Sequence, residues 1–426
     1  MVLESATKVS RHFWNPCTQM KEFESMPPLQ IVDAMGDYIT LNTGEKLIDG
    51  IASWWCKVLG HKHPVLTQAL KDQADRFEHV MLGGVVYDEV ERLSKRLCDL
   101  TRMDKVFYAC DGSSAVEIAL KMALHAQRLQ GRASKVMALE NDYHGETCGA
   151  LSVTDIAYFQ KTYAPYLFKV DFLKSIPYVS GPHDPLWTDC SSVWPLIEAQ
   201  LSAIAPTIII VESIVQGAIG MQVYSADFLS RLSAWALKNK AYLIVDEIMT
   251  GFGRTGKWFA YQHANIEPDF ICVGKGLTAG YLPMSAVMTR QDIFLHFYSD
   301  DKASTFFHSH TFSGNALSVA VAHACLDTLI ENDYVNKAAE NSVWIFSLMH
   351  QLAEETHALR AVRGVGAMVA ADLIRQSGAD FYPRILKEGA FLRPIGQAIY
   401  WFLPLNTERA IWTALRDMTA RALRGV

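Results

Sequence analysis

The sequence predicts an α/β protein built around a mostly parallel β-sheet. From about residue 105 to residue 275, short apolar runs rich in β-branched residues alternate with segments of helical periodicity. The connections between successive apolar runs are long enough to cross over between parallel strands. Beyond residue 325 a long helical segment is followed by several short strand-like runs, and this order predicts a second, smaller α+β domain.

The expected helices and strands follow from apolar periodicity along the chain. Residues 39–41 and 46–49 flank the turn sequence Asn42-Thr-Gly-Glu45 and predict a short hairpin. The strands of the main sheet are expected at 105–109, 135–139, 207–212, 242–245, 270–273 and 284–289. Helices are expected at 65–74, 87–100, 115–126, 226–239, 316–331, 334–357 and 407–423. C-terminal strands are expected at 361–366, 367–372, 390–394 and 398–403.

The chain is long enough for more than one domain. At 426 residues, about two domains are expected, and half of the residues are hydrophobic, which suffices for a large core. We predict that residues 1–60 form an N-terminal segment that contributes to the small domain. Residues 61–325 would form the large domain, and residues 326–426 the C-terminal small domain. Within the large domain, residues 154–188 predict an irregular excursion rich in Tyr, Pro and Phe.

Composition excludes several classes of function. The net charge of −6 argues against a nucleic-acid-binding surface. The eight cysteines show no CxxC spacing and the 14 histidines no HExxH motif, so we expect reduced thiols and no metal site. Residues Met1 to Arg11 lack the apolar core of a signal peptide, and no stretch of about 20 apolar residues predicts a membrane span. We therefore expect a cytoplasmic protein that does not bind membranes.

Two charged residues follow neighbouring apolar runs: Asp246 ends one run, and Lys275 comes soon after the next. Because ligands bind beyond the carboxyl ends of strands in open α/β sheets, we expect both side chains at one edge. A lysine amine beside a carboxylate suits pyridoxal phosphate, since the amine condenses with the cofactor aldehyde and the carboxylate pairs with the pyridine nitrogen. Burial would also lower the pKa of the lysine and make its amine a better nucleophile. The alternative is that both are ordinary solvated charges at strand ends.

A phosphate-binding turn is expected just before the helix at 115–126. The sequence Asp111-Gly112-Ser113-Ser114 follows a predicted strand, so backbone N–H groups and the positive end of the helix would lie at the sheet edge. Many strand-to-helix turns contain Gly-Ser, so this pattern alone leaves phosphate binding open. Tyr143 follows another predicted strand, and it either stacks on a flat cofactor ring or packs as a loop aromatic.

Residues Gly251 to Gly256 match the GxGxxG pattern of dinucleotide-binding oxidoreductases. In those proteins the pattern opens a helix and is followed about 20 residues later by a strand-end acid. Here Asp246 precedes the glycines, and Lys257-Trp-Phe259 shows no amphipathic helix start. We therefore prefer the pyridoxal-phosphate interpretation, and we also prefer it to a non-catalytic binding protein, which would not need the Asp246–Lys275 pair.

The block Val245-Asp246-Glu247-Ile248, followed by Gly251-Phe-Gly-Arg-Thr-Gly256 and Gly274-Lys275-Gly276, resembles the signature of the class III pyridoxal-phosphate aminotransferases. The other landmarks of that family occur in the same order, and they are Ser53-Trp54-Trp55, Asp111-Gly112-Ser113, Tyr143-His144-Gly145, Thr311-Phe-Ser-Gly-Asn315 and Arg393-Pro394. Together the landmarks span nearly the whole chain, from Trp14 to Arg393. The resemblance implies fold type I of the pyridoxal-phosphate-dependent transferases.

The resemblance implies specific roles in binding the cofactor. Lys275 and Asp246 would be the catalytic residues, and both would contact pyridoxal phosphate. The further cofactor-binding residues would be Gly112, Ser113, Tyr143, His310 and Thr311. The loop at 304–315 would reach the cofactor of a neighbouring subunit, which implies a homodimer with shared active sites.

The resemblance is strongest to the family members that act in biotin synthesis. It implies ping-pong transfer of an amino group from S-adenosylmethionine to 8-amino-7-oxononanoate, which gives 7,8-diaminopelargonic acid. The substrate-binding residues would be Trp54, Tyr143, Ser309, Arg393 and Cys17. Arg393 would hold the substrate carboxylate, a task that suits its planar guanidinium, and Arg254 ranks below it.

Two positions depart from the pattern of those members. Cys17 stands where they carry a tyrosine, and Ser309-His310-Thr311 stands where they carry Gly-Pro-Thr. Both departures lie on the side of the amino donor. Lysine as the donor, or another ω-amino-acid or diamine aminotransferase activity, therefore remains an alternative.

Overall fold

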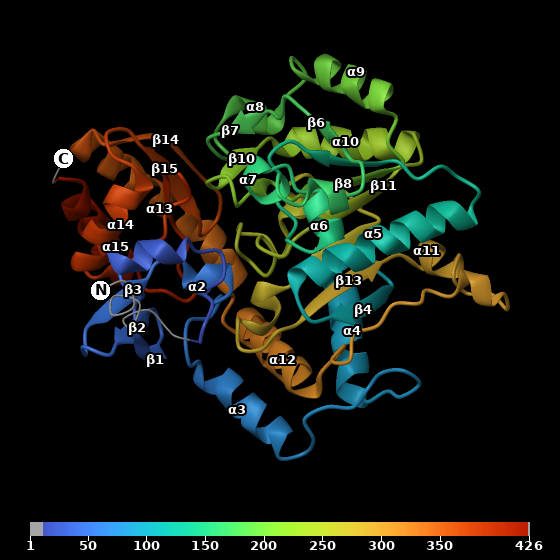
Figure 1. Ribbon diagram of the computed structural model, residues 1–426, viewed down its shortest axis with the longest axis horizontal. Coiled ribbons are helices and arrows are strands. Elements are labelled where there is room, and N and C mark those ends of the chain that lie inside the picture. The colour runs from blue at the N-terminus through green and yellow to red at the C-terminus, as the bar shows by residue number, and fades with distance from the viewer. Residues whose placement is uncertain (1–11, 425–426) are drawn as a thin grey trace.

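The computed structural model describes residues 12–424. Residues 1–11, for which the sequence argues against a signal peptide, and residues 425–426 lie outside the described part. A seven-stranded sheet with strand order β4-β13-β12-β11-β8-β5-β6 forms the centre of the molecule (Figure 1). Its strands are β4 (Lys105–Ala109), β5 (Val136–Leu139), β6 (Asp171–Leu173), β8 (Ile208–Glu212), β11 (Tyr242–Asp246), β12 (Phe270–Val273) and β13 (Ser285–Thr289). In this sheet β13 runs antiparallel to both neighbours, and the other pairs are parallel.

The structure confirms the predicted mostly parallel sheet. Six of its seven strands coincide with predicted apolar runs, and β6 is the exception. That strand has only three residues and begins with Asp171, which explains why apolar patterning did not reveal it. It lies inside the segment 154–188 that was predicted to be irregular.

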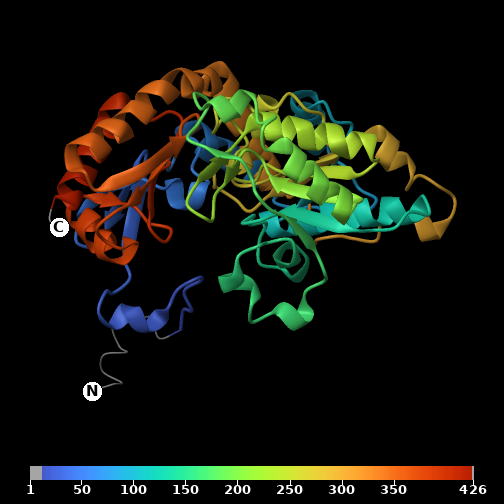
Figure 2. The ribbon, with the colours of Figure 1, turned by 90° about the horizontal axis from the view of Figure 1, so that it is seen from above.

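Two helices cover opposite faces of this sheet. Along β8, Ile208 and Ile210 pack with α5 (Gly112–Leu129), whereas Ile209 and Val211 pack with α10 (Ala226–Lys238). Figure 2 shows these two helices on either side of the strands. Because side chains alternate along a strand, burial on both faces requires an uninterrupted apolar run, and that is what the sequence contains.

A second α+β unit follows the main sheet in the chain. The antiparallel strands β14 (Leu359–Gly364), β15 (Val369–Leu373) and β17 (Ala398–Trp401) form its sheet. The long helices α13 (Tyr334–Thr356) and α15 (Arg409–Leu423) pack together in this unit (Figure 1). Residues 12–424 contain no helix that is long and apolar enough to cross a membrane.

The N-terminal segment joins this C-terminal unit through a four-stranded sheet. Its strands are β1 (Ile31–Met35), β2 (Tyr38–Leu41), β3 (Lys46–Asp49) and β16 (Ala390–Phe391). β16 pairs in parallel with β3, so segments about 340 residues apart in sequence share one sheet. This pairing agrees with an N-terminal segment that contributes to the small domain, although the predicted domain boundaries themselves remain a prediction.

The remaining elements are mostly short. A small sheet contains β7 (Tyr178–Val179), β10 (Gln222–Tyr224) and β9 (Val215–Gln216). The other helices are α2 (Ala52–Trp55), α3 (Pro64–Ala74), α4 (Asp88–Thr101), α6 (Cys148–Ser152), α7 (Ala157–Gln160), α8 (Pro185–Thr188), α9 (Trp194–Ile204), α11 (Gln291–Leu295), α12 (Ala316–Glu331) and α14 (Gly378–Lys387). The 3-10 turns are η2 (Met20–Glu24), η3 (Ala164–Tyr166), η4 (Ala260–His263), η5 (Lys275–Thr278) and η6 (Lys302–Ser304).

The GxGxxG segment connects the two units and does not open an α-helix. The side chain of Arg254 is buried and donates hydrogen bonds to the carbonyl oxygens of Ala367 and Leu403, at 2.9 and 2.6 Å. Its guanidinium lies 3.8 Å from the centre of the Phe402 ring. Burial lowers the pKa of Arg254 to about 9. These contacts tie the loop to the C-terminal unit, so Arg254 is not a candidate for substrate binding.

Gly366 allows the two backbones to approach each other at this junction. Its φ is +63°, and a Cβ atom there would collide with the carbonyl groups of Arg254 and Thr255. We expect Gly366→Ala to lower the free energy of unfolding by roughly 2 kcal/mol or more, because backbone strain and the collision act together. The melting temperature should then fall by about 2 °C or more.

The control for this prediction is Gly44→Ala. Gly44 also has a positive φ, +86°, but nothing lies within 4 Å of the position of its Cβ. This variant should lose only about 1 kcal/mol, the conformational cost alone. Equal losses in the two variants would contradict the close approach at Gly366.

Candidate active site

A cavity of about 520 Å³ lies at the carboxyl edge of the main sheet. Its lining includes five of the residues predicted to bind the cofactor: Asp246, Lys275, Gly112, Ser113 and Tyr143. Asp246 is the last residue of β11, and Lys275 begins η5, two residues after β12 ends. Because β11 and β12 are adjacent and parallel, the sheet delivers both groups to the same place.

The carboxylate of Asp246 is held by two hydrogen bonds. The backbone N–H of Ile248 donates to Oδ1 at 3.0 Å, and Nδ1 of His144 lies 2.8 Å from Oδ2. His144 is buried, and its other ring nitrogen lies 3.4 Å from a carboxylate oxygen of Asp142. Burial by itself lowers the pKa of His144, but the two neighbouring acids outweigh burial and raise it to about 10. A protonated His144 therefore faces Asp246 and stabilises its negative charge.

Lys275 lines the cavity and is only partly exposed. Its Nζ lies 4.8 Å from the centre of the Trp55 ring. Burial lowers the pKa of Lys275, and the nearby acids Asp246 and Glu212 oppose this change. The lowered pKa increases the fraction of neutral amine, which is the nucleophilic form.

The first turn of α5 and the turn after Tyr143 form one rim of the cavity. Asp111 accepts the N–H of Ser114 at 2.9 Å, while the N–H groups of Gly112 and Ser113 have no hydrogen-bond acceptor within residues 12–424. The Ser113 hydroxyl oxygen accepts the N–H groups of Glu146 and Thr147, at 3.1 and 3.2 Å. This rim therefore offers free amide donors at the positive end of a helix of 18 residues.

Gly145 makes the contact between these two turns possible. Its φ is +125°, and a Cβ atom at this position would collide with the Ser113 hydroxyl. Residues with a Cβ rarely adopt such a φ, so glycine satisfies both the conformation and the space.

The residues of this cavity fit pyridoxal phosphate. A buried carboxylate that faces a protonated histidine can pair with the pyridine nitrogen, and a buried amine with a lowered pKa can bond to the aldehyde. The free amides at the start of α5 suit the phosphate group. Tyr143 lines the cavity and donates a hydrogen bond from its hydroxyl to Glu146 at 3.0 Å, while its ring packs against Phe159 with the centroids 5.6 Å apart.

Arg393, Trp54 and Cys17 form a second cluster of predicted residues. The guanidinium of Arg393 lies 4.8 Å from the centre of the Trp54 ring and donates a hydrogen bond to the Cys17 carbonyl oxygen at 3.0 Å. Trp54 is 45% exposed, whereas Trp55 is buried and lines the Lys275 cavity. The two adjacent tryptophans thus contact different residues: Trp55 faces Lys275, and Trp54 faces Arg393.

The predicted residues Ser309, His310 and Thr311 do not join the Lys275 cavity within this chain. They line a separate cavity of about 530 Å³, which also includes Met81 and Phe107. Nearby, Lys121 contacts His308 at 2.8 Å, and His308 contacts His310 at 3.2 Å. These three residues therefore do not contribute to the cofactor cavity of their own chain.

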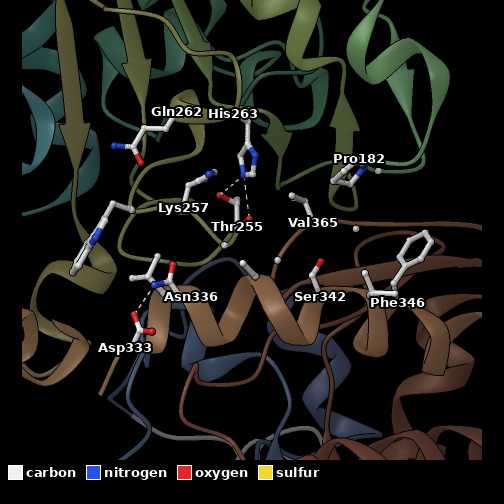
Figure 3. Close-up of a pocket in the computed structure, with 18 of the residues that line it drawn as sticks. Pro182, Thr255, Lys257, Gln262, His263, Asp333, Asn336, Ser342, Phe346 and Val365 are labelled. Carbon is white, nitrogen blue, oxygen red and sulfur yellow. Dashed lines mark hydrogen bonds between the residues drawn. The ribbon is translucent and has the colours of Figure 1, made fainter. Parts of the chain in front are cut away.

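A further cavity, of about 560 Å³, lies between the main sheet and α13 (Figure 3). Figure 3 shows His263 donating toward Thr255, and Asn336 toward Asp333 at the start of α13. Burial lowers the pKa of His263 to about 4, so its ring is neutral. The one lysine in this lining, Lys257, is exposed, so the cavity lacks the buried amine and carboxylate that a pyridoxal site needs.

Sequence reasoning missed several residues around the cofactor cavity. His144 and Asp142 extend the chain of charges behind Asp246, and Glu212 accepts the N–H groups of Tyr143 and Gly217, at 2.8 and 3.0 Å. His144 belongs to the Tyr-His-Gly landmark, and Glu212 ends β8, so motif and strand-end signals were present for both. Within the described residues, no group of three or more His, Cys, Asp or Glu side chains could hold a metal ion.

Comparisons with a family model and with known proteins both point to one family of aminotransferases. The class III aminotransferase family model matches residues 19–423. An adenosylmethionine-8-amino-7-oxononanoate aminotransferase from Helicobacter pylori is 37% identical over 404 residues, which cover 92% of this chain and 91% of the relative.

Solved structures agree with the family match. The crystal structure of adenosylmethionine-8-amino-7-oxononanoate aminotransferase from Methanocaldococcus jannaschii has a TM-score of 0.88 and 30% identity, covering 99% of this chain and 98% of that one. A PLP-bound amine transaminase from an uncultivated Pseudomonas species has a TM-score of 0.90 and 28% identity, with 97% and 98% covered. This chain therefore belongs to the class III aminotransferases, which are pyridoxal-phosphate-dependent enzymes of fold type I.

Proposed function

We propose that this enzyme transfers an amino group from S-adenosylmethionine to 8-amino-7-oxononanoate and so makes 7,8-diaminopelargonic acid. The observation that carries this proposal is the similarity along almost the full chain to relatives that bear this name, at 30% identity or more. The cluster of Arg393 and Trp54 supports it, because a guanidinium over an aromatic face suits a carboxylate at the end of an apolar chain.

Each of the residues that line the cavity would have a distinct role in the reaction. Asp246, held by His144, would pair with the pyridine nitrogen, and the amides of Gly112 and Ser113 would bind the phosphate. Pyridoxal phosphate, when bound, supplies an electron sink that stabilises negative charge on the substrate carbon. Lys275 Nζ would remove a proton from the carbon that carries the amino group of the donor and deliver it within the same half-reaction, and it would move a proton in the reverse sense to the acceptor carbon in the second half-reaction. Donor and acceptor occupy the same site in turn.

We extend the proposal to a homodimer. Thr311 and His310 would complete the phosphate site of the partner subunit, since they lie apart from Lys275 in their own chain. The same loop exposes Phe307 and Phe312, whose side chains are 79% and 58% exposed. Exposed aromatic side chains next to a functional loop are typical of a surface that another chain covers.

Lys275→Ala tests the catalytic assignment. This variant should bind pyridoxal phosphate without covalent attachment, and borohydride should fix no cofactor to the protein. Turnover should fall by at least about four orders of magnitude, because both the covalent bond and the proton carrier are lost. The matched control is Lys257→Ala, which removes an exposed lysine from the other cavity and should leave turnover unchanged. Wild-type turnover in Lys275→Ala would refute the assignment.

The amino donor can be decided by a direct comparison. Wild-type enzyme is incubated with 8-amino-7-oxononanoate and either S-adenosylmethionine, lysine or a simple ω-amino acid, and the product is identified by mass. We expect 7,8-diaminopelargonic acid with S-adenosylmethionine at a kcat/KM about 100-fold or more above that with lysine, the selectivity that a few specific polar contacts provide. A preference for lysine would show that Cys17 and His310 mark a different donor site.

The charge on His144 predicts a pH dependence of stability. Its pKa rises from about 6.5 in the unfolded chain to about 10 in the folded protein. Because its pKa is higher in the folded state, protonated His144 contributes its full stabilisation of the fold below pH 6.5. This contribution is lost as the pH rises through about 10. The melting temperature of the wild-type apoprotein should therefore exceed that of His144→Asn most at pH 6, and the difference should shrink steadily towards pH 10. A difference that stays constant over this range would argue against a charged His144.

A further inference from the structure

Four consecutive residues of α2 adopt a left-handed backbone. The φ angles of Ala52, Ser53, Trp54 and Trp55 are 48°, 46°, 69° and 72°. None of the four is glycine, so each Cβ atom crowds its own backbone. Strained conformations of this kind persist only where the surrounding structure enforces them, and they concentrate at functional sites.

The left-handed turn supplies an aromatic face to each of two basic side chains. The ring of Trp55 faces Nζ of Lys275, and the ring of Trp54 faces the guanidinium of Arg393, both at 4.8 Å. The indole N–H of Trp55 donates to the hydroxyl of Tyr400 at 3.2 Å, which fixes the orientation of that ring. One turn thereby connects the proposed proton carrier with the proposed carboxylate-binding residue.

A partly buried hydrogen-bonded cluster holds the middle of this turn. Ser53 Oγ donates to Oδ2 of Asp49 at 2.6 Å, and Nε2 of His61 lies 2.8 Å from the same oxygen. Asp49 is 2% exposed, and its other carboxylate oxygen has no partner in the described part of the chain. Asp49 is the last residue of β3, so a carboxylate anchored on a sheet reaches the strained segment.

We propose that Asp49, Ser53 and His61 are positioning residues of this enzyme. Their cluster keeps the turn left-handed and thereby sets Trp54 against Arg393 and Trp55 against Lys275. None of the three lines the Lys275 cavity, so they act through the tryptophans and not on the substrate. This inference rests on the proposed roles of Arg393 and Lys275.

Two substitutions of one residue separate positioning from a general loss of stability. Ser53→Ala and Ser53→Gly both remove the hydroxyl, but glycine adopts a positive φ without strain, whereas alanine does not. If the hydroxyl serves to hold the turn, Ser53→Gly should keep the tryptophans in place better than Ser53→Ala. The matched control is Ser94→Ala, which removes another half-buried, hydrogen-bonded serine hydroxyl, on α4.

The first measurement is binding of nonanoate, a nine-carbon carboxylate, by calorimetry. We expect Ser53→Ala to weaken nonanoate affinity about tenfold, because Arg393 loses its aromatic support, and to raise KM for 8-amino-7-oxononanoate in parallel. Ser53→Gly should stay within about threefold of wild type, and Ser94→Ala should match it. The second measurement is the pH midpoint of the visible absorbance of the holoenzyme, which should shift in Ser53→Ala and not in Ser53→Gly.

The possible outcomes decide the inference. Equal nonanoate affinities in Ser53→Ala and Ser53→Gly, whether both wild-type or both weakened, would overturn it. If Ser53→Ala does not fold, His61→Ala removes the other partner of Asp49, and unchanged nonanoate affinity in that variant would overturn the inference as well. Failure of the proposed function would instead appear in the wild-type enzyme, as absent turnover with 8-amino-7-oxononanoate, while nonanoate binding would still test the cluster.

Discussion

The site depends on burying an amine and a carboxylate together at one edge of the sheet. Burial penalises both charges, and the protein resolves this penalty differently for each. Asp246 has a protonated His144 at 2.8 Å, which stabilises its charge. Lys275 has an aromatic face close to its Nζ, and burial lowers its pKa although Asp246 and Glu212 oppose this change. The carboxylate of Asp246 is thus placed to pair with a pyridinium, whereas Lys275 is shifted toward its neutral, nucleophilic form.

The register between β11 and β12 fixes the positions of Asp246 and Lys275 relative to each other. Asp246 pairs with Cys272 across the parallel strands β11 and β12, and Lys275 follows Cys272 by three residues. The antiparallel strand β13 then returns beside β12, so the segment between these two strands is confined to the edge where α5 begins. Loops alone would not fix the distance between the two groups so closely, because their backbones are not held in a ladder.

Sequence patterns predicted the parts of the fold that depend on apolar periodicity. Runs such as 242–245 and 270–273 are buried on both faces, and the ends of these runs identified Asp246 and Lys275 as candidate site residues. The contact between His144 and Asp246 depends on the path of a turn, which periodicity does not describe. The left-handed turn at Ala52–Trp55 contains no glycine, so no local signal marked it. The structure also shows which tryptophan faces the lysine, a choice that residue types alone left open.

The strained turn and the loop at 309–311 both bear on how the proposed site is completed. The left-handed turn costs roughly 1–2 kcal/mol for each residue in the conformation. The proposed cluster opposes this strain through Asp49, which the N-terminal sheet holds at the end of β3. The residues at 309–311 likewise line a cavity separate from that of Lys275 in their own chain. The turn links the site to the N-terminal sheet through Asp49, the last residue of β3. If residues 309–311 complete a partner's phosphate site as proposed, the competent cavity depends on subunit assembly as well as on folding around Lys275.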